Sequence, residues 1–148
     1  MTRPRHIASC SGGKDSVATI LLAAQNNEPL DEIVFAEVMF DPNTTGEVPE
    51  HRDFIYDKLK PFCEKELGVK FTILHGGKTY DDIFHHIIVR GPHQGEKRGF
   101  AWAGMCAVNR ECKTNPMTRY NLSLIHISEP TRLDVISYAV FCLKKKFF

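Results

Sequence analysis

A short stretch near the N-terminus, "SCSGGKDS" at residues 9–16, concentrates residue types that bind phosphate. It follows an apolar run from Ile7 to Cys10 that predicts a strand, and it precedes an apolar run from Val17 to Ala24 that predicts a helix. Backbone N–H groups at a helix N-terminus lack intrahelical partners and lie at the positive end of the helix dipole. A tight turn at this corner therefore predicts an anion site.

The side chains in this turn suit phosphate transfer. Gly12 and Gly13 let the backbone approach a ligand closely. Ser11 and Ser16 can donate hydroxyl hydrogen bonds to phosphate oxygens. Lys14 can neutralise the charge that builds up on a departing pyrophosphate, so the chemistry expected here is cleavage or binding of a nucleotide's phosphates.

Asp15 allows two interpretations. It can cap the helix, which would explain the turn without any ligand, or it can hold Mg²⁺ through water. The order of glycines, lysine and apolar helix favours a ligand site. The spacing fits neither the G-x-x-x-x-G-K-[ST] phosphate loop nor the G-x-G-x-x-G dinucleotide fingerprint, so this is a different phosphate loop.

The elements that position this loop alternate along the chain. Strands are predicted over 33–40 and 69–74, a helix from Pro49 with a kink at Pro61, and another helix over 80–89. Strands that alternate with helices predict an α/β fold with a doubly wound parallel sheet, here with about three strands. Ligands of such sheets bind beyond the carboxyl ends of the strands, where the turn at 9–16 falls.

A glycine-rich basic segment follows, "RGPHQGEKRGFAWAG" over residues 90–104, and it predicts a long loop. Arg90, Lys97 and Arg98 can hold an anionic substrate, or they can simply be solvated. Both interpretations stay open from the sequence.

Composition places the chain in a broad class. Its 148 residues correspond to one domain, and they contain neither a signal-peptide pattern nor an apolar run long enough to span a bilayer, which predicts a cytoplasmic protein without a membrane partner. The net charge of +1 gives no global reason to expect nucleic acid, so any anion site must be local. Five cysteines do not form a secreted disulfide framework.

The last segment, residues 122–148, differs from the rest. Its sequence "LSLIHISEPTRLDVISYAVFCLKKKFF" resembles the translation of a sequencing-library adapter followed by a run of adenines. We therefore expect residues 1–121 to be the N-terminal part of a nucleotide-binding domain and 122–148 to be a non-native tail. Without the tail the net charge becomes −1, because the tail carries four of the 19 basic and two of the 18 acidic residues.

The motif "SGGKDS" resembles the pyrophosphate loop of the adenine nucleotide alpha hydrolase superfamily, which includes N-type ATP pyrophosphatases and ATP sulfurylase small subunits. The stretches "EVMFDPNTTGEVPEHRDFI" and "ECKTNPM" resemble elements of the phosphoadenosine phosphosulfate reductase family in that superfamily. The resemblance extends from Arg5 to Asn121.

This resemblance implies a nucleotide site and an enzyme. The reaction would be attack at the α-phosphorus or sulfur of an adenine nucleotide, with ATP or a relative as the ligand, Mg²⁺ as a possible companion and a sulfur donor or acceptor as partner. Lys14 and Asp15 would be catalytic, and the adenine would lie at residues 38–41. The implied binding residues are Ser9, Ser11, Gly12, Gly13, Lys14, Asp15, Ser16, Val38, Phe40 and Asp41.

Two departures from the family keep alternatives open. The chain retains Lys14, which many of the reductases have lost, and it ends before the reductases' C-terminal nucleophilic cysteine would appear. Lys14 favours ATP cleavage to an adenylate and pyrophosphate. The alternatives are a truncated nucleotide-binding module without catalysis, and an ATP-dependent sulfurtransferase that modifies nucleic acid.

Cysteines and histidines give no metal site in the sequence. Cys106 and Cys112 have the wrong spacing for a zinc pair, and an iron–sulfur cluster would need two further ligands, so core or idle thiols are expected. Cys10 and Cys63 are expected in the core. His85 and His86 are adjacent and so lie on different faces of a helix, which argues against a shared metal.

Overall fold

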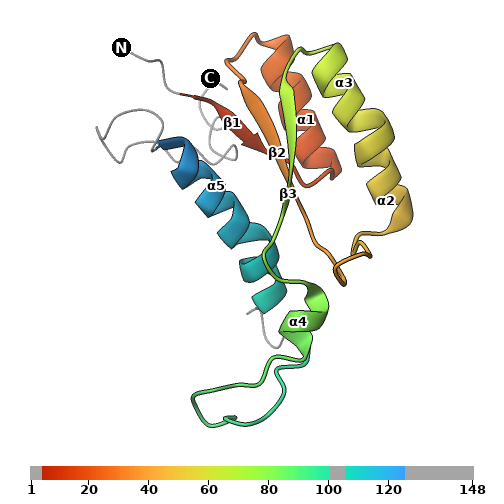
Figure 1. Ribbon diagram of the computed structural model, residues 1–148. Helices are drawn as coiled ribbons and strands as arrows, with labels where there is room; N and C mark the ends of the chain where they lie inside the picture. The colour runs from red at the N-terminus through yellow and green to blue at the C-terminus, as the bar shows by residue number, and fades with distance from the viewer. Residues whose placement is uncertain (1–4, 101–105, 126–148) are drawn as a thin grey trace, which may run out of the picture. The chain divides into compact units, whose positions relative to one another are not determined.

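The structure is a computed structural model that describes residues 5–100 and 106–125 (Figure 1). It confirms an α/β fold with a three-stranded parallel sheet in the order β1-β2-β3. The elements in chain order are β1 (Ile7–Ser9), α1 (Lys14–Gln25), β2 (Glu32–Glu37), α2 (Pro49–Asp53), η1 (Phe54–Leu59), α3 (Lys60–Lys65), β3 (Lys70–His75), α4 (Tyr80–Phe84), η2 (Asn109–Thr114) and α5 (Asn115–Ile125).

The described residues divide into two compact units. The first contains residues 5–35, 49–73 and 124–125, and the second contains 36–48, 74–100 and 106–123. Each unit has its own apolar cluster, and the two are described separately below.

The core of the first unit lies between the sheet and its helices. Ile33 and Phe35 of β2 pack with Ile20 of α1, and with Ile55 and Cys63 of the helical stretch from Pro49 to Lys65. All five side chains are buried, and burial of one large aliphatic side chain contributes about 2 kcal/mol. The apolar start of α1 that the sequence predicts is thus explained by its packing against the strands.

The stretch from Pro49 to Lys65 is helical throughout, but its middle turn, η1, is π-helical. Pro61 lies in the first turn of α3, directly after η1. A proline ring clashes with the carbonyl four residues before it and removes one hydrogen bond. The irregularity predicted at Pro61 therefore takes the form of a widened turn that precedes it.

The strand predicted over 33–40 ends earlier, at Glu37. Beyond it the chain turns back, because the N–H of Gly46 donates to the carbonyl of Val38 at 2.7 Å and the N–H of Phe40 donates to the carbonyl of Thr44 at 2.8 Å. Residues 38–46 thus form a tight loop.

The helix predicted over 80–89 is wrong in its second half. Helix α4 begins with a capping box between Thr79 and Asp82, but it ends at Phe84. From there the backbone pairs with a later segment: the N–H of Arg98 donates to the carbonyl of His86 at 2.9 Å, and Ile87 bridges Lys97. The β-branched run at 87–89 favours extended backbone, which explains why a helical spacing was misleading here.

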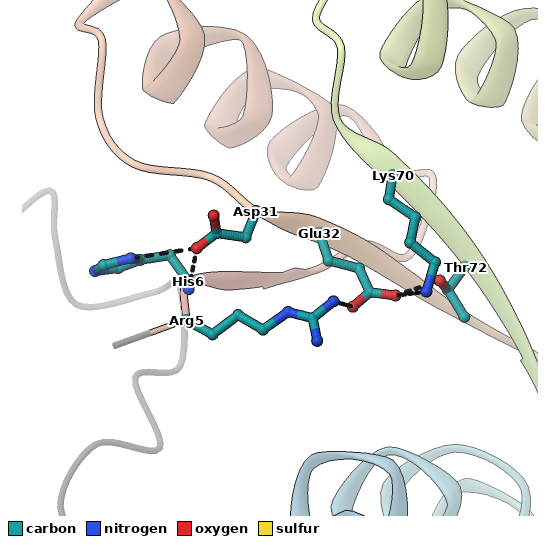
Figure 2. Close-up of polar contacts among 6 residues, drawn as sticks. All are labelled: Arg5, His6, Asp31, Glu32, Lys70 and Thr72. Carbon is teal, nitrogen blue, oxygen red and sulfur yellow. Dashed lines mark hydrogen bonds and ion pairs between the residues drawn. The ribbon is translucent and has the colours of Figure 1, made fainter. Parts of the chain in front are cut away.

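At the amino-end of the sheet, a buried carboxylate ties three segments together (Figure 2). Glu32 of β2 is 0% exposed and pairs with the guanidinium of Arg5 at 2.6 Å and the ammonium of Lys70 at 3.0 Å. The hydroxyl of Thr72 donates to the same carboxylate. Nearby, the N–H of His6 donates to Asp31 at 2.8 Å. These contacts satisfy a charge that would otherwise be costly to bury.

We expect Glu32→Gln to lower the free energy of unfolding by about 2 kcal/mol, because it removes charge-assisted hydrogen bonds inside the sheet while keeping the volume. Arg5 and Lys70 are half-exposed and regain water, which limits the loss. Urea denaturation measures the change, with the exposed Glu28→Gln as control. Equal stability of the two variants would contradict a stabilising role for the cluster.

The predicted junction after Asn121 falls inside a helix. Helix α5 continues to Ile125, so four residues of the expected tail are helical, and residues 126–148 lie outside the described residues. Among the described helices, none combines the length and the apolar character needed to cross a membrane.

Candidate functional site

The phosphate-loop candidate lies between β1 and α1. Ser9 ends β1, and α1 begins at Lys14 with Gly13 as its N-cap residue. Gly13 is extended, with φ −75° and ψ 161°, and no side chain caps the helix. The N-terminal N–H groups of α1 are thus left without a side-chain acceptor, as an anion site requires.

The loop is held in shape by its own polar groups. The hydroxyl of Ser16 donates to the carbonyl of Gly13 at 2.8 Å and lies 3.3 Å from the hydroxyl of Ser11. The N–H of Gly12 donates to the sulfur of Cys10 at 3.3 Å. Cys10 is buried as predicted, and it has a second role in the loop that the sequence pattern did not indicate.

Gly12 is the residue of the loop whose backbone conformation requires glycine. Its φ is +74°, a left-handed value that favours glycine. A Cβ atom there would lie 2.6 Å from Nε2 of His51 and 2.7 Å from Cδ1 of Ile55. At Gly13 a Cβ would meet only the hydroxyl of Ser11, at 3.4 Å. The sequence predicts that both glycines let a ligand approach the backbone closely. The structure distinguishes them: Gly12 is packed against the chain's own side chains, whereas the space beside Gly13 is open.

Lys14 and Asp15 point their charges away from the core. Both are exposed, and no ion pair joins Lys14 to any residue that the structure describes. Asp15 lies inside the first helical turn rather than at the cap. The interpretation of Asp15 as a helix cap is therefore wrong, and its carboxylate is left on the surface beside Lys14.

His51 of α2 is a site residue that sequence reasoning missed. Its ring lies against the backbone of Gly12, and the ring of Phe35 approaches it edge-on with centroids 6.3 Å apart. The next residue, Arg52, places its guanidinium 4.6 Å from the centroid of the Tyr56 ring. A basic pair in the first turn after a helix-starting proline, "PEHR", is the signal that could have pointed to this position.

The residues predicted to contact adenine lie in the second unit, and the structure brings together two of the three. Val38 and Phe40 line a hollow of about 520 Å³, and Phe40 stacks on Tyr80 with centroids 5.6 Å apart and an interplanar angle of 14°. We call this the aromatic hollow; its lining is Val38, Phe40, Gly46, Tyr80, Asp81, Phe84, His85 and Phe100. Apolar, aromatic linings suit flat rings.

Asp41, the third residue predicted to contact adenine, holds the backbone of its own loop instead. Its carboxylate accepts hydrogen bonds from the N–H groups of Asn43 and Thr44, both at 2.7 Å, and it does not line the aromatic hollow. The hydrogen bond from the Asn43 backbone, followed by one from the Thr44 side chain, holds the pKa of Asp41 below its usual value. Asp41 thus shapes the loop at 38–46 that presents Phe40.

A carboxylate–imidazole pair stands at the ends of two strands and was also missed. Glu37 of β2 is buried and accepts from the hydroxyl of Thr45 at 2.9 Å. Nε2 of His75 of β3 lies 2.7 Å from its other oxygen, while the His75 side chain is half-exposed. The pair joins the loop at 38–46 to the end of β3.

The described cysteines differ in how far their thiols are buried. Cys112 is buried with Val38 and Ile83, its sulfur donates to the carbonyl of Lys78 at 3.3 Å, and burial raises its pKa. Cys106 is exposed, and neither forms a disulfide. Burial also raises the pKa of Cys63 to about 11. Over the ranges 5–100 and 106–125, no three His, Cys, Asp or Glu side chains group in a way that could hold a metal ion.

Comparisons of the chain with protein-family models, with curated proteins and with solved structures find no match.

Proposed function

We propose that the chain binds the phosphates of an adenine nucleotide in the loop at 9–16 and acts at the α-phosphorus or sulfur of that nucleotide. The resemblance to the phosphoadenosine phosphosulfate reductase family supplies the nucleotide and the reaction. The observation that carries the proposal is an uncapped N-terminus of α1, preceded by the open backbone of Gly13 and flanked by the exposed Lys14.

The loop has the properties that a phosphate group needs. Its backbone is already held by the hydrogen bonds of Ser16 and Cys10, so little ordering is required on binding. The buried side of the loop is closed by His51 and Ile55, which leaves the Gly13 side for the ligand. The charge of Lys14 and the dipole of α1 both favour an anion there.

The loop offers one exposed carboxylate, that of Asp15, as a possible ligand for Mg²⁺. Protein sites for Mg²⁺ use one or two carboxylates together with substrate phosphates, and Asp15 is the exposed carboxylate on the first turn of α1. When bound, the ion would neutralise charge on the phosphates. Lys14 supplies a charge of the same sign from the chain itself.

For the base, Val38 and Phe40 stay the predicted contacts, and the aromatic surface on which they lie has suitable chemistry. Asp41 is not expected to touch the base, because its carboxylate is already used by the backbone of the loop at 38–46. The sulfur donor or acceptor that the resemblance implies stays a prediction.

Calorimetric titration with ATP and Mg²⁺, together with an assay for pyrophosphate, tests the proposal. We expect ATP binding by the 148-residue chain and at least tenfold weaker binding by Gly13→Val, because the valine side chain fills the space of the phosphates. The backbone of Gly13 is extended, so the substitution does not strain it. Gly77→Val, at a glycine with nothing within 4 Å of its Cβ position, is the matched control.

The result also separates the two candidate functions. ATP binding with release of pyrophosphate supports the enzyme, and binding without release supports a nucleotide-binding module. If ATP does not bind, or binds Gly13→Val as tightly as the unmodified chain, then the loop only begins a helix and the proposal fails.

A further inference from the structure

The second unit carries a basic hairpin that the nucleotide site does not use. Residues 86–99 form it, with Ile87 bridging Lys97 and the N–H of Ile88 donating to the carbonyl of Glu96 at 2.9 Å. At its tip, the N–H of Gly95 donates to the carbonyl of Ile88 at 2.8 Å. The segment that the sequence indicated as a long loop is therefore a hydrogen-bonded, shaped surface up to residue 100.

The charge of this hairpin is one-sided. It contains Arg90, Lys97 and Arg98 against a single acidic residue, Glu96. The carboxylate of Glu96 lies 3.1 Å from Nδ1 of His93. Among the residues that the structure describes, no carboxylate pairs with any of the three cations. Their charge is available to an outside anion, although the chain as a whole is nearly neutral.

Large apolar side chains stand exposed beside these cations. Phe100 is 78% exposed, Val89 is 66% exposed, and the Phe100 ring contacts Phe84 edge-on with centroids 5.0 Å apart. That contact holds the Phe100 ring on the surface. Phe100 follows Lys97 and Arg98 within three residues, so an exposed aromatic ring and two cations lie close together along the chain.

We infer that the hairpin at 86–99 together with Phe100 binds single-stranded nucleic acid, with the cations along the phosphates and Phe100 stacked on a base. Single-strand binding surfaces combine these two elements, a cationic track and exposed aromatic rings. The cations of the hairpin argue against an apolar protein partner. Burying unpaired cations at the centre of an apolar interface would cost their desolvation free energy. The inference concerns binding alone. Phe100 also lines the aromatic hollow, whereas Arg90, Lys97 and Arg98 do not, so the cations test the inference apart from the nucleotide site.

Fluorescence anisotropy with labelled oligo(dT) and oligo(U) of about 12 residues tests it, a length within known single-strand site sizes. We expect Phe100→Ser to weaken binding about tenfold or more, the scale of one lost stacking contact, and Phe100→Tyr to retain it. Phe62→Ser in α3, at another exposed phenylalanine, is the control and should leave binding unchanged. The two oligonucleotides separate DNA from RNA as the preferred strand.

The cations are tested through salt. Between about 50 and 200 mM salt, the double variant Lys97→Gln, Arg98→Gln should show a slope of log affinity against log salt that is smaller by about 1.4, which is 0.7 for each lost phosphate contact. Lys58→Gln with Lys65→Gln is the matched control on the other unit. The lysines of the C-terminal segment are present in every variant and so contribute equally.

Binding that is unaffected by Phe100→Ser and by the double variant, in proteins with unchanged circular dichroism, overturns the inference. Equal affinity for a duplex of the same length overturns the stacking part, since a paired base does not reach the ring. Loss of ATP binding with intact oligonucleotide binding would reject the nucleotide site alone. The double variant Lys97→Gln, Arg98→Gln leaves the lining of the aromatic hollow unchanged, so it tests the hairpin alone.

Discussion

Lys14→Met is expected to lower the rate of pyrophosphate release about a hundredfold while changing ATP affinity only a few-fold. The ammonium of Lys14 neutralises charge that grows as pyrophosphate departs, so its contribution is larger in the transition state than in the bound ground state. Removal of one such group costs about 3 kcal/mol. Single-turnover release of pyrophosphate gives the rate, and calorimetry gives the affinity.

The comparison needs a lysine without this role. Lys58 of η1 is exposed, and Lys58→Met removes the same charge from the chain while leaving the loop at 9–16 intact. A loss of ATP affinity in Lys14→Met with an unchanged single-turnover rate at saturating ATP would make Lys14 a ground-state contact. A rate that matches the Lys58→Met control would remove Lys14 from the proposed chemistry.

Gly12→Ala is expected to lower the free energy of unfolding by about 3 kcal/mol, the largest stability effect that we predict. Its φ of +74° is unfavourable for any residue with a Cβ atom. The new atom would also lie 2.6 Å from the His51 ring and 2.7 Å from the Ile55 side chain, within a buried position. Urea denaturation at equilibrium measures the loss.

Gly13→Ala is the control, since its backbone is extended and a Cβ atom meets only the hydroxyl of Ser11 at 3.4 Å. We expect its stability to stay within about 0.5 kcal/mol of the unmodified chain. His51→Ala in the Gly12→Ala background removes the nearest clashing atom, so it should recover part of the loss and leave the part due to φ. Similar stability of Gly12→Ala and Gly13→Ala would contradict the close packing of the loop.

Local patterns along the chain were enough to predict the class of fold and the place of the loop. Alternating apolar runs and helix signals give the parallel α/β sheet, because periodicity reflects which neighbouring residues face the core. The strand from Lys70 to His75 and the helix start at Pro49 lie within a residue of their predicted positions. The glycine–lysine–aspartate turn falls at the junction of β1 and α1 for the same local reason.

The sequence-based prediction was wrong where the local helix preference of a segment competes with backbone pairing to a distant segment. The spacing of apolar residues over 80–89 suits a helix, yet residues beyond Phe84 pair with the segment at 96–99. No short window contains both partners of that pairing. For the same reason, the segment predicted as a long glycine-rich loop is a hairpin in the structure over residues 86–99.

The tertiary structure alone decided which residues of the candidate site act together. It brings His51 against Gly12, and it shows that the two adjacent glycines have opposite surroundings. It also separates Phe40, which lines the aromatic hollow, from Asp41, which holds the backbone of its own loop. Such contacts depend on the directions of side chains from elements far apart in the chain, and these directions are set by the packing of the helices on the sheet rather than by any local sequence pattern.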